Sequence, residues 1–439
     1  MKRTILTKKP AWLALLAILI LFGGCGKKDA GYNGQSEKVV INYVYWGDAS
    51  EIALNEYWIK EFETKYPNIK VNKIHVAGNQ GMTSAKILTM VAGGDPPDVM
   101  YAWPEVFADF CQKNVYLPLD SFLKDDRINR KEWYPEILRA YTYNNSLYGL
   151  PRSWHPLVLY YNKTLFDQGG VSYPDSTWTW DTVIKYGQKL TKDINGDGKM
   201  DQFAIYNPHW EMFIWSAGGK VFDEEGSRCF LDDPRTIAGL QLERDLIWKH
   251  RISPSSQQIS QTQGAENMFI TGRIAMYPTG LWVIPQFRTI KNFQWDIAVV
   301  PAGKIRKTKM VTAGWGISSI TKHPRESWEF VKYLTGSEAQ EYQMKLGRDP
   351  SALTEVFEKY LFYEPGKPPV NRQAVMQSIK FGQFSPVFAG FNEIAGKVNE
   401  AVDKILFFEK CDVKKTCEEA SAETNKLIQS IQTKKKGVK

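Results

Sequence analysis

One segment of the sequence places acidic and amide side chains at the spacing of a calcium-binding loop. Residues 193–201 read DINGDGKMD, with oxygen-bearing side chains at loop positions 1, 3, 5 and 9 and glycine at position 6. In an EF-hand loop these positions supply ligands and the sharp turn, and the backbone carbonyl of position 7 is a further ligand. The candidate ligands are Asp193, Asn195, Asp197, Lys199 through its carbonyl, and Asp201.

The match to an EF-hand stops at that point. Position 12 is Ala204, where the bidentate glutamate should stand, so a complete EF-hand is not expected. Two interpretations remain open. The loop either holds a structural calcium ion that is completed by an acid from elsewhere in the chain, or it is a tight turn stabilised by its own Asp and Asn side chains.

Catalytic signatures are missing from the sequence. It contains no HExxH, GxSxG, Walker A or CxxC motif, and its five histidines are scattered. A glycoside hydrolase needs two carboxylates about 5–10 Å apart, and acids are plentiful enough to leave that class open. Cys411 and Cys417 span the link between two predicted helices and could form a disulfide in an exported protein. Cys111 and Cys229 are expected to be buried and free.

The N-terminus predicts export. Residues 2–9 carry four positive charges, and residues 11–22 form an apolar run that is too short to span a bilayer. Gly23-Gly24-Cys25 follows and resembles a bacterial lipobox, although Phe22 stands where Leu or Val is preferred. We therefore expect residues 1–24 to be a lipoprotein signal peptide and Cys25 to be lipidated. The alternative is a plain secreted protein with an incidental cysteine. Residues 25–37 are polar and Gly-rich, as in a flexible tether.

The remainder has the composition of a globular protein. Of the 439 residues, 43% are hydrophobic and 24% are charged, and the net charge of +8 gives no reason to expect nucleic-acid binding. Residues 39–46, 69–76 and 98–103 are predicted strands with helices between them, a rhythm typical of an α/β sheet. Residues 157–161 read as a strand that enters another sheet. The C-terminal third is predicted to be helical.

The order of several short motifs resembles a known family. They are Tyr45-Trp46-Gly47, Gly94-Asp95-Pro96-Pro97-Asp98-Val99, Tyr148-Gly149-Leu150-Pro151, Thr179-Trp180-Asp181, Ser216-Ala217-Gly218-Gly219, Ala313-Gly314-Trp315-Gly316-Ile317 and Trp328-Glu329-Phe330-Val331-Lys332-Tyr333-Leu334-Thr335. Residues 38–430 thereby resemble the extracellular solute-binding proteins of bacterial ABC importers, in the group that contains maltose-binding protein.

The resemblance implies a two-lobe α/β periplasmic-binding-protein fold, type II-like. Each lobe is expected to be a sheet flanked by helices, with the ligand cleft at the hinge. The chain is expected to cross between lobes near 150–156, 276–282 and 322–326. The expected boundaries are 38–151 and 278–324 for lobe 1, 152–277 and 325–432 for lobe 2, and 433–439 for a basic tail.

Candidate ligand-binding residues follow from the chemistry of sugars, whose apolar faces stack on flat aromatic rings and whose hydroxyls need planar hydrogen-bonding partners. Tryptophans at strand ends and hinge crossings are expected to face the cleft, whereas Trp58, Trp248 and Trp328 on helical faces are expected in the core. The candidates are Trp46, Asp48, Trp103, Arg152, Trp154, Trp210, Trp282, Trp315 and Arg348. Asn79 and Glu211 are further polar candidates.

The function implied by the resemblance is capture of a carbohydrate and its delivery to a membrane permease that is driven by a separate ATPase. We expect a monomer outside the cytoplasm, held to the membrane by its lipid, without enzymatic activity and with no required cofactor. A structural Ca²⁺ belongs to one of the two interpretations of the 193–201 loop. The small number of clustered cations favours a neutral oligosaccharide, but Arg152 leaves an anionic ligand open. The alternatives are a secreted glycoside hydrolase and a carbohydrate sensor or adhesin that does not transport.

Overall fold

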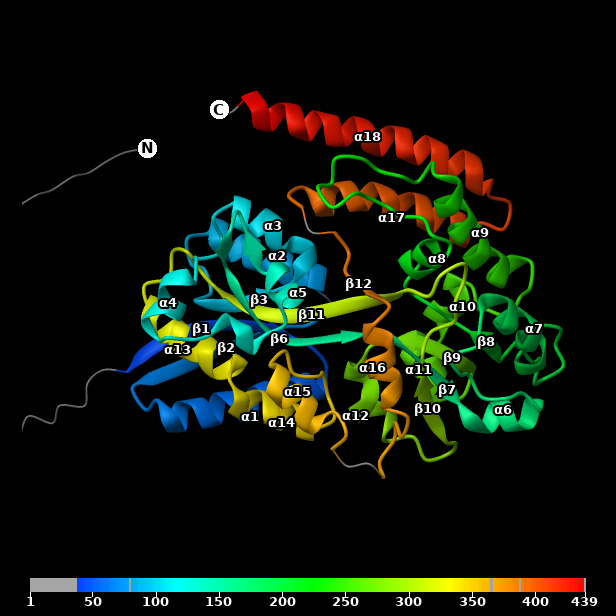
Figure 1. The fold of residues 1–439 in the computed structure, drawn as a ribbon, viewed down its shortest axis with the longest axis horizontal. Helices are drawn as coiled ribbons and strands as arrows, with labels where there is room; N and C mark the ends of the chain where they lie inside the picture. Colours follow the sequence, from blue (N-terminus) through cyan, green and yellow to red (C-terminus); the bar gives the residue numbers. More distant parts are fainter. Residues whose placement is uncertain (1–37, 79, 364–365, 387, 438–439) are drawn as a thin grey trace, which may run out of the picture. The chain divides into compact units, whose positions relative to one another are not determined.

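The structure is a computed structural model that describes residues 38–78, 80–363, 366–386 and 388–437 (Figure 1). The predicted signal peptide, tether and lipidation at Cys25 lie outside these residues, as does Asn79. No described helix has the length and apolarity that crossing a membrane requires.

The first lobe is built on a six-stranded sheet. Its order is β12-β11-β3-β1-β2, with β6 paired to the other side of β11. β1 runs parallel to β2 and β3, whereas β11 is antiparallel to β3 and β6. The bounds are β1 (Val39–Trp46), β2 (Ile69–Val76), β3 (Val99–Ala102), β6 (Gly149–Pro156), β11 (Thr308–Ile317) and β12 (Gly382–Gln383). The predicted strands 39–46 and 69–76 are confirmed.

Helices cover this sheet and complete its core. In α1 (Ala49–Lys65) the predicted apolar face is buried, and Trp58 packs edge-to-face on Trp315 of β11. The remaining elements of the lobe are α2 (Gln80–Ala92), α3 (Pro104–Gln112), α4 (Asp120–Asp125), η1 (Arg130–Glu132), α5 (Pro135–Arg139), β4 (Thr142–Tyr143), β5 (Ser146–Leu147), α13 (Pro324–Thr335), α14 (Ser337–Lys345) and α15 (Thr354–Tyr360). Trp328 of α13 is fully buried here, as predicted.

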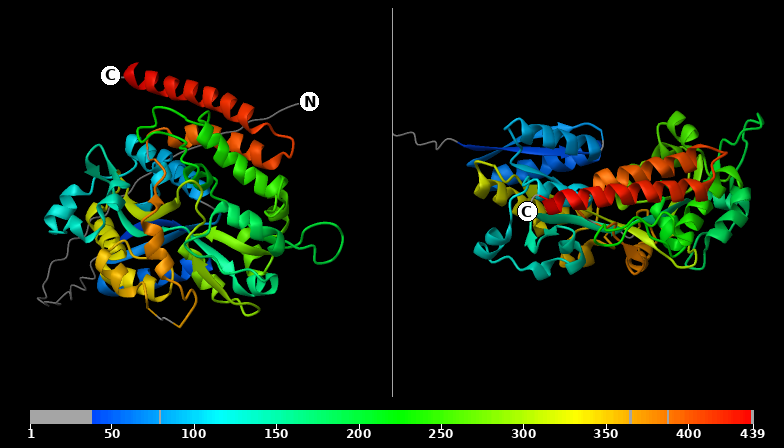
Figure 2. Two further views of the ribbon diagram at one scale, coloured as in Figure 1. Left: turned by 45° about the vertical axis from the view of Figure 1, so that its right-hand side comes forward. Right: turned by 90° about the horizontal axis from the view of Figure 1, so that it is seen from above.

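The second lobe is built on a four-stranded sheet of order β10-β7-β9-β8. Its strands are β7 (Val158–Asn162), β8 (Phe203–Ile205), β9 (Ile274–Thr279) and β10 (Trp295–Ala298). The helices are α6 (Lys163–Gly169), α7 (Trp180–Leu190), α8 (Glu211–Ser216), α9 (Pro234–Trp248), α10 (Ser256–Gln261), α11 (Ala265–Ile270), η2 (Leu281–Val283), α12 (Ile284–Phe287), α16 (Gln373–Ile379), α17 (Phe391–Phe407) and α18 (Val413–Gly437). The two C-terminal helices lie side by side in Figures 1 and 2.

The lobe boundaries expected from the sequence differ from the two cores at two segments. Residues 278–324 are expected in lobe 1, yet β10 pairs with β7 of the second sheet. Residues 325–432 are expected in lobe 2, yet α13, α14 and α15 pack into the first core, where Trp328, Phe330 and Leu334 are fully buried. The apolar face of a helix shows that it packs on something but not on which sheet, so composition alone misassigns these segments.

The four described cysteines are unbridged. Cys111 and Cys229 are buried, as predicted. Cys417 is buried as well, while Cys411 is half-buried with its sulfur 3.3 Å from the Thr416 hydroxyl. The disulfide left open between Cys411 and Cys417 is therefore not formed in this structure.

Candidate functional site

A cavity of about 530 Å³ lies between the two lobes. That volume is within the range of small-molecule binding sites. The first lobe contributes Trp46, Asp48, Glu51, Tyr101, Trp103, Glu105, Arg152, Arg348 and Asp349 to its wall, and the second contributes His209, Glu266 and Trp282. Residues 309–313 of β11 and 384–386, which follow β12, complete it. We call this space the interlobe cavity.

Two of its tryptophans are placed by the ends of parallel strands. Trp46 is the last residue of β1, and Trp103 follows β3 as the N-cap of α3, where Pro104 occupies the first turn. The carboxyl ends of parallel strands meet at one edge of a sheet, which is where α/β proteins bind ligands. The two ring centroids are 6.1 Å apart, and both residues line the cavity.

The turn after β1 brings a helix N-terminus to the same edge. Gly47 has a φ of +133°, a conformation that side chains disfavour, and it lets the chain turn directly from the strand into α1. Asp48 is the N-cap of α1 and accepts a hydrogen bond from the Glu51 backbone N–H at 2.8 Å. This turn directs Asp48 and Glu51 toward the cavity.

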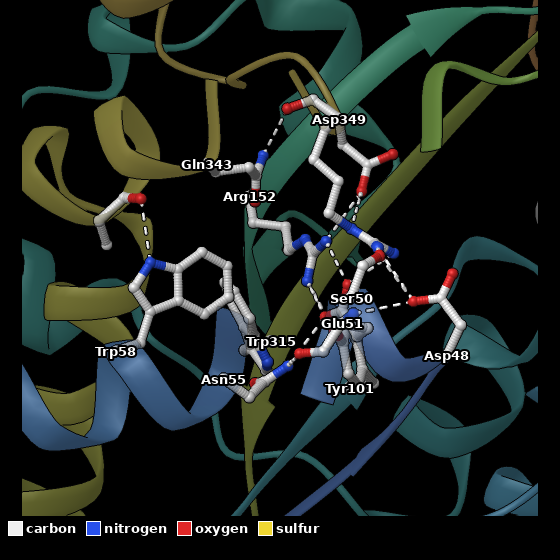
Figure 3. Close-up of polar contacts among 12 residues, drawn as sticks. Asp48, Ser50, Glu51, Asn55, Trp58, Tyr101, Arg152, Trp315, Gln343 and Asp349 are labelled. Carbon is white, nitrogen blue, oxygen red and sulfur yellow. Dashed lines mark hydrogen bonds and ion pairs between the residues drawn. The ribbon is translucent and has the colours of Figure 1, made fainter. Parts of the chain in front are cut away.

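The first-lobe wall holds a carboxylate–guanidinium network of Asp48, Glu51, Arg152, Arg348 and Asp349, which is buried except for Asp48 at its rim. Asp48, Glu51, Arg152 and Asp349 are labelled in Figure 3. Arg152 donates to Glu51 at 2.5 Å and to Asp349 at 2.9 Å. Arg348 contacts Glu51 at 2.9 Å and Asp48 at 3.1 Å. Arg348 also lies 3.7 Å from Asp349, so Arg152 is held by two carboxylates and Arg348 by three. The predicted candidates Asp48, Arg152 and Arg348 are brought together, but the two cations are engaged by the protein itself.

The network keeps its carboxyl groups ionised. Burial alone would raise the pKa of Glu51, but the guanidinium groups of Arg152 and Arg348 hold the pKa below its ordinary value. The pKa of Asp349 is lowered far more strongly, because contacts with His155 and Arg152 outweigh its burial. Burial would raise the pKa of Asp48, at the rim, but the charge of Arg348 is the main cause that lowers it below its ordinary value.

The second-lobe wall includes Glu266 on α11 and Trp282 on η2. The Trp282 ring lies 5.5 Å from the ring of His155, which belongs to β6 of the first lobe. Burial raises the pKa of Glu266, a hydrogen bond from Trp282 opposes this, and the charge of Asp48 raises it further. The influence of Asp48 links the first lobe to Glu266 across the cavity. Glu266 forms no ion pair with any described residue.

A further ion pair lies where β11 meets the second lobe. Lys309 of β11 pairs with Glu211 of α8 at 2.8 Å. Burial would lower the pKa of Lys309, but Glu211 and, to a smaller extent, Glu105 keep it raised. His209 beside this pair is half-buried, and both desolvation and Lys309 lower its pKa to about 4, so it is neutral at pH 7.

Two predicted cleft residues are not in the cavity wall, so that part of the prediction is wrong. Trp315 is 0% exposed, donates to the Tyr43 hydroxyl at 3.0 Å and lies 5.5 Å from the Arg152 guanidinium. The strand alternation of β11 turns it toward the core, where α1 covers the sheet. Trp154 is 6% exposed and packs between Tyr134 and Phe357.

The predicted candidate Trp210 does not line the interlobe cavity. It lines a second cavity, together with the predicted candidate Glu211. Several wall residues were missed by sequence reasoning, namely Glu51, Tyr101, Glu105, His155, His209, Glu266 and Lys309. For Glu51 a signal was present, since it occupies the first turn of a helix that starts directly after Trp46-Gly47-Asp48. Lys309 and Glu266 carried no such signal, because their place depends on how the lobes meet.

The loop at 193–201 has the contacts of a tight turn. Asp193 accepts from the backbone N–H groups of Gly196 and Gly198 at 2.7 and 2.8 Å. Asp201 accepts from the Ile194 N–H at 2.9 Å. Asn195 and Asp197 accept from backbone N–H groups two residues further on. Among the described residues no group of three or more His, Cys, Asp or Glu side chains is arranged to hold a metal ion. The calcium ion therefore stays a prediction.

Two α/β lobes with a cavity between them, lined by aromatic rings and charged groups from both, define a two-lobe binding protein. A sequence profile of the family described as bacterial extracellular solute-binding protein matches residues 37–341. This chain belongs to that family.

Individual relatives agree with this assignment. A multiple sugar-binding protein of Streptococcus mutans is 25% identical over 373 residues, which cover 80% of this chain and 84% of the relative. An uncharacterized ABC transporter extracellular-binding protein of Pyrococcus horikoshii is 30% identical over 315 residues, 68% of each chain. Among solved structures, an ABC substrate-binding protein of Listeria monocytogenes in complex with cycloalternan has a TM-score of 0.82 and 26% identity, covering 89% of this chain and 99% of that one.

Proposed function

We propose that this protein is the carbohydrate-binding component of an ABC importer. It captures a neutral saccharide in the interlobe cavity by closure of the lobes and delivers it to a membrane permease that a separate ATPase drives. The aromatic residues of the cavity support this, because Trp46 and Trp103 stand on one wall and Trp282 on the other. Rings on opposing walls can stack on both faces of a sugar ring. The relatives named for sugars and the cycloalternan complex support the same class of ligand.

The preference for a neutral ligand rests on the charges of the cavity. Its described lining includes the cations Arg152, Lys309 and Arg348, and each of them already pairs with carboxylates of the protein. Glu105 and Glu266 form no ion pair with any described residue, although Glu105 is close enough to Lys309 to raise its pKa. A phosphate or uronate group would therefore meet an excess of negative charge with no cation ready to neutralise it. Sugar hydroxyls, in contrast, can donate to the available carboxylates.

The cellular setting extends this proposal. The charged N-terminus, the apolar run and Gly23-Gly24-Cys25 support export, cleavage of residues 1–24 and lipid attachment at Cys25. We further propose a monomer outside the cytoplasm, anchored to the membrane by this lipid, that binds its ligand without converting it. A calcium ion at Asp193, Asn195, Asp197, Lys199 and Asp201 would be structural. It would require their side chains to exchange turn hydrogen bonds for the metal.

The proposal is tested by a thermal-shift screen of the secreted domain against neutral mono- to hexasaccharides, each paired with an acidic analogue such as a sugar phosphate or uronate. A neutral ligand at a hundred times its dissociation constant should add about 2.7 kcal/mol of stability. The acidic analogue should add almost nothing. Stabilisation by acidic sugars alone would overturn the neutral class. Stabilisation by no carbohydrate, or release of cleaved products, would overturn the proposed function.

Anchoring is tested separately in cells. Cys25→Ser should abolish labelling by a fatty-acid analogue and release the protein into the soluble fraction. A Cys111→Ser variant, which alters a buried thiol, is the control and should remain labelled. Labelling that survives Cys25→Ser would contradict the lipobox.

A further inference from the structure

A second, smaller cavity of about 210 Å³ adjoins the interlobe cavity, and we call it the side chamber. The two cavities share Glu105, Lys309, Ser385 and Pro386 as wall residues, so they are neighbours separated by these side chains. The side chamber is far larger than the roughly 30 Å³ that one water molecule occupies in the liquid. It is also smaller than an independent small-molecule site, which typically begins near 300 Å³. Its size is that of an annex to the interlobe cavity.

The walls of the side chamber have the chemistry of the interlobe cavity. Trp210 and Trp215 of the α8 region and Phe391 of α17 supply aromatic surface. Glu211, Gln383 and Asn399 supply polar groups at its edges. The Lys220 ammonium, a further wall residue, is held over the Phe230 ring at 4.1 Å. Apolar rings beside hydrogen-bonding groups suit a sugar ring better than a purely apolar ligand.

The boundary between the cavities is made by charged groups from three elements. Lys309 extends from β11 to Glu211 of α8, and Glu105 of α3 is close enough to raise the pKa of Lys309. Lys309 lines both cavities and Glu211 lines the side chamber, and their side chains are 16% and 17% exposed, so this ion pair stands at the boundary. A chain of sugar units that crosses the boundary would meet ammonium donors and carboxylate acceptors at the point where its hydroxyls pass.

We propose that the side chamber is a second ligand subsite, joined to the interlobe cavity past the Lys309–Glu211 pair, and that it makes this protein selective for saccharides long enough to reach it. This inference rests on the proposed function, because it specifies the length of the ligand. A short saccharide fills the interlobe cavity alone. A longer one places a further unit against Trp210 and Phe391.

Filling the side chamber from its far wall tests this directly. Ala395 and Asn399 of α17 line the side chamber but not the interlobe cavity, so Ala395→Trp and Asn399→Trp each occupy it without touching the first site. Asn392→Trp is the matched control, since Asn392 is exposed on the same helix and lines neither cavity. Linear gluco-, manno- and arabino-oligosaccharides of two to six units are titrated calorimetrically, alongside thermal melts of each variant.

In the wild type and in Asn392→Trp, affinity should rise with ligand length and then level off. In the two filled variants it should level off at least one unit earlier, with affinity for the longest ligands reduced tenfold or more and affinity for the shortest binding ligand unchanged. Equal affinity of all four proteins at every length would overturn the subsite. An equal loss at every length in folded variants would also overturn it, because the chamber would then belong to the first site. If no saccharide binds the wild type, the proposed function itself fails and this inference with it.

Discussion

The two walls of the interlobe cavity satisfy their charges in different ways. On the first-lobe wall, Arg152 is held by two carboxylates and Arg348 by three, and these guanidinium groups lower the pKa of Glu51 so that it stays ionised. On the second-lobe wall, Glu266 has an indole beside it and no cationic partner among the described residues. The arginines of the first wall are already paired within the protein, whereas Glu266 of the second wall keeps hydrogen-bonding capacity for a ligand.

This difference separates residues that hold the site in shape from residues that are available to the ligand. Position in the cavity lining does not distinguish them, since Arg152 and Trp282 both line it. What distinguishes them is the number of ion-pair and hydrogen-bond partners that each residue already has within the protein. The comparison therefore predicts that substitutions on the first-lobe wall change stability most, and that substitutions on the second-lobe wall change affinity most.

The largest effect is expected for Arg152→Ala. It removes a buried cation and leaves Glu51 and Asp349 with only Arg348 and His155 as partners, which should cost about 3–5 kcal/mol of unfolding free energy. Urea unfolding of the secreted domain measures the loss. Arg130→Ala, which removes an exposed ion pair with Asp120, is the control and should cost less than about 1 kcal/mol. Equal losses of unfolding free energy in the two variants would show that the buried network contributes no more to stability than a surface ion pair.

A smaller loss of stability is expected for Trp315→Phe. The change removes the indole N–H that donates to the Tyr43 hydroxyl and opens space beneath Arg152, for a cost of about 1–3 kcal/mol. Because Trp315 lies in the core, affinity for the bound saccharide should stay within about threefold of wild type. Calorimetric titration beside urea unfolding separates the two quantities. Weakened saccharide binding at unchanged stability would contradict the core role and indicate that Trp315 contacts the ligand.

On the opposite wall, Trp282→Ala should weaken saccharide binding about tenfold, equivalent to about 1.4 kcal/mol, because one stacking surface is lost. Its effect on unfolding should be well below that of Arg152→Ala, since Trp282 is only half-buried. Trp248, also half-buried but lying on α9 away from the cavity, supplies the control variant Trp248→Ala, which should bind normally. Normal binding by Trp282→Ala as well would contradict a ligand role for this wall.

The smallest effect concerns pH, and it has opposite signs on the two walls. The pKa of Glu266 is raised in the folded protein, so its contribution is present below the unfolded value and is lost as pH rises through the folded value. The pKa values of Glu51 and Asp349 are lowered in the folded protein, so their ionised forms stabilise it above the unfolded pKa values near pH 4. This stabilisation is lost as the pH falls. Glu266→Gln should therefore gain stability over wild type only above about pH 4.5.

Melting temperatures of wild type and Glu266→Gln between pH 3 and 8 measure this difference. The curves should converge in acid, where Glu266 is protonated in both folded and unfolded protein. A gap that widens as the pH falls would have the wrong sign. Glu51→Gln supplies the opposite sign, because it should be less stable than wild type near neutral pH, and this deficit should shrink as the pH falls.

Sequence reasoning located the strand ends but not the partners of the side chains there. Trp46 and Trp103 were predictable because each directly follows a β-rich segment of a βαβ rhythm. Trp315 occupies a comparable motif between glycines, but which face of β11 it occupies depends on the alternation of the strand against α1. The pairing of Arg152 with Asp349 joins residues 197 positions apart, and no local pattern reports it.

Local sequence patterns also fail to decide which lobe the helices α13 to α15 join and whether the loop at 193–201 is a turn or a calcium site. The helices α13 to α15 carry ordinary apolar faces that would fit either sheet, and only the tertiary fold assigns them to the first core. At 193–201 one pattern of Asp, Asn and Gly serves a turn and a metal site equally well, because both need oxygen atoms directed inward. The turn contacts are formed in the structure, while occupancy by calcium is a matter for chelation and native mass spectrometry.

The distribution of tryptophan gives the protein a built-in optical signal. Of its 15 tryptophans, Trp46, Trp103 and Trp282 line the interlobe cavity, whereas Trp58, Trp315 and Trp328 are sealed in the first core. Excluding water from the cavity changes the emission of the first group and leaves that of the second unchanged. Occupancy can therefore be followed by intrinsic fluorescence without a label, and the rate of lobe closure becomes accessible by rapid mixing.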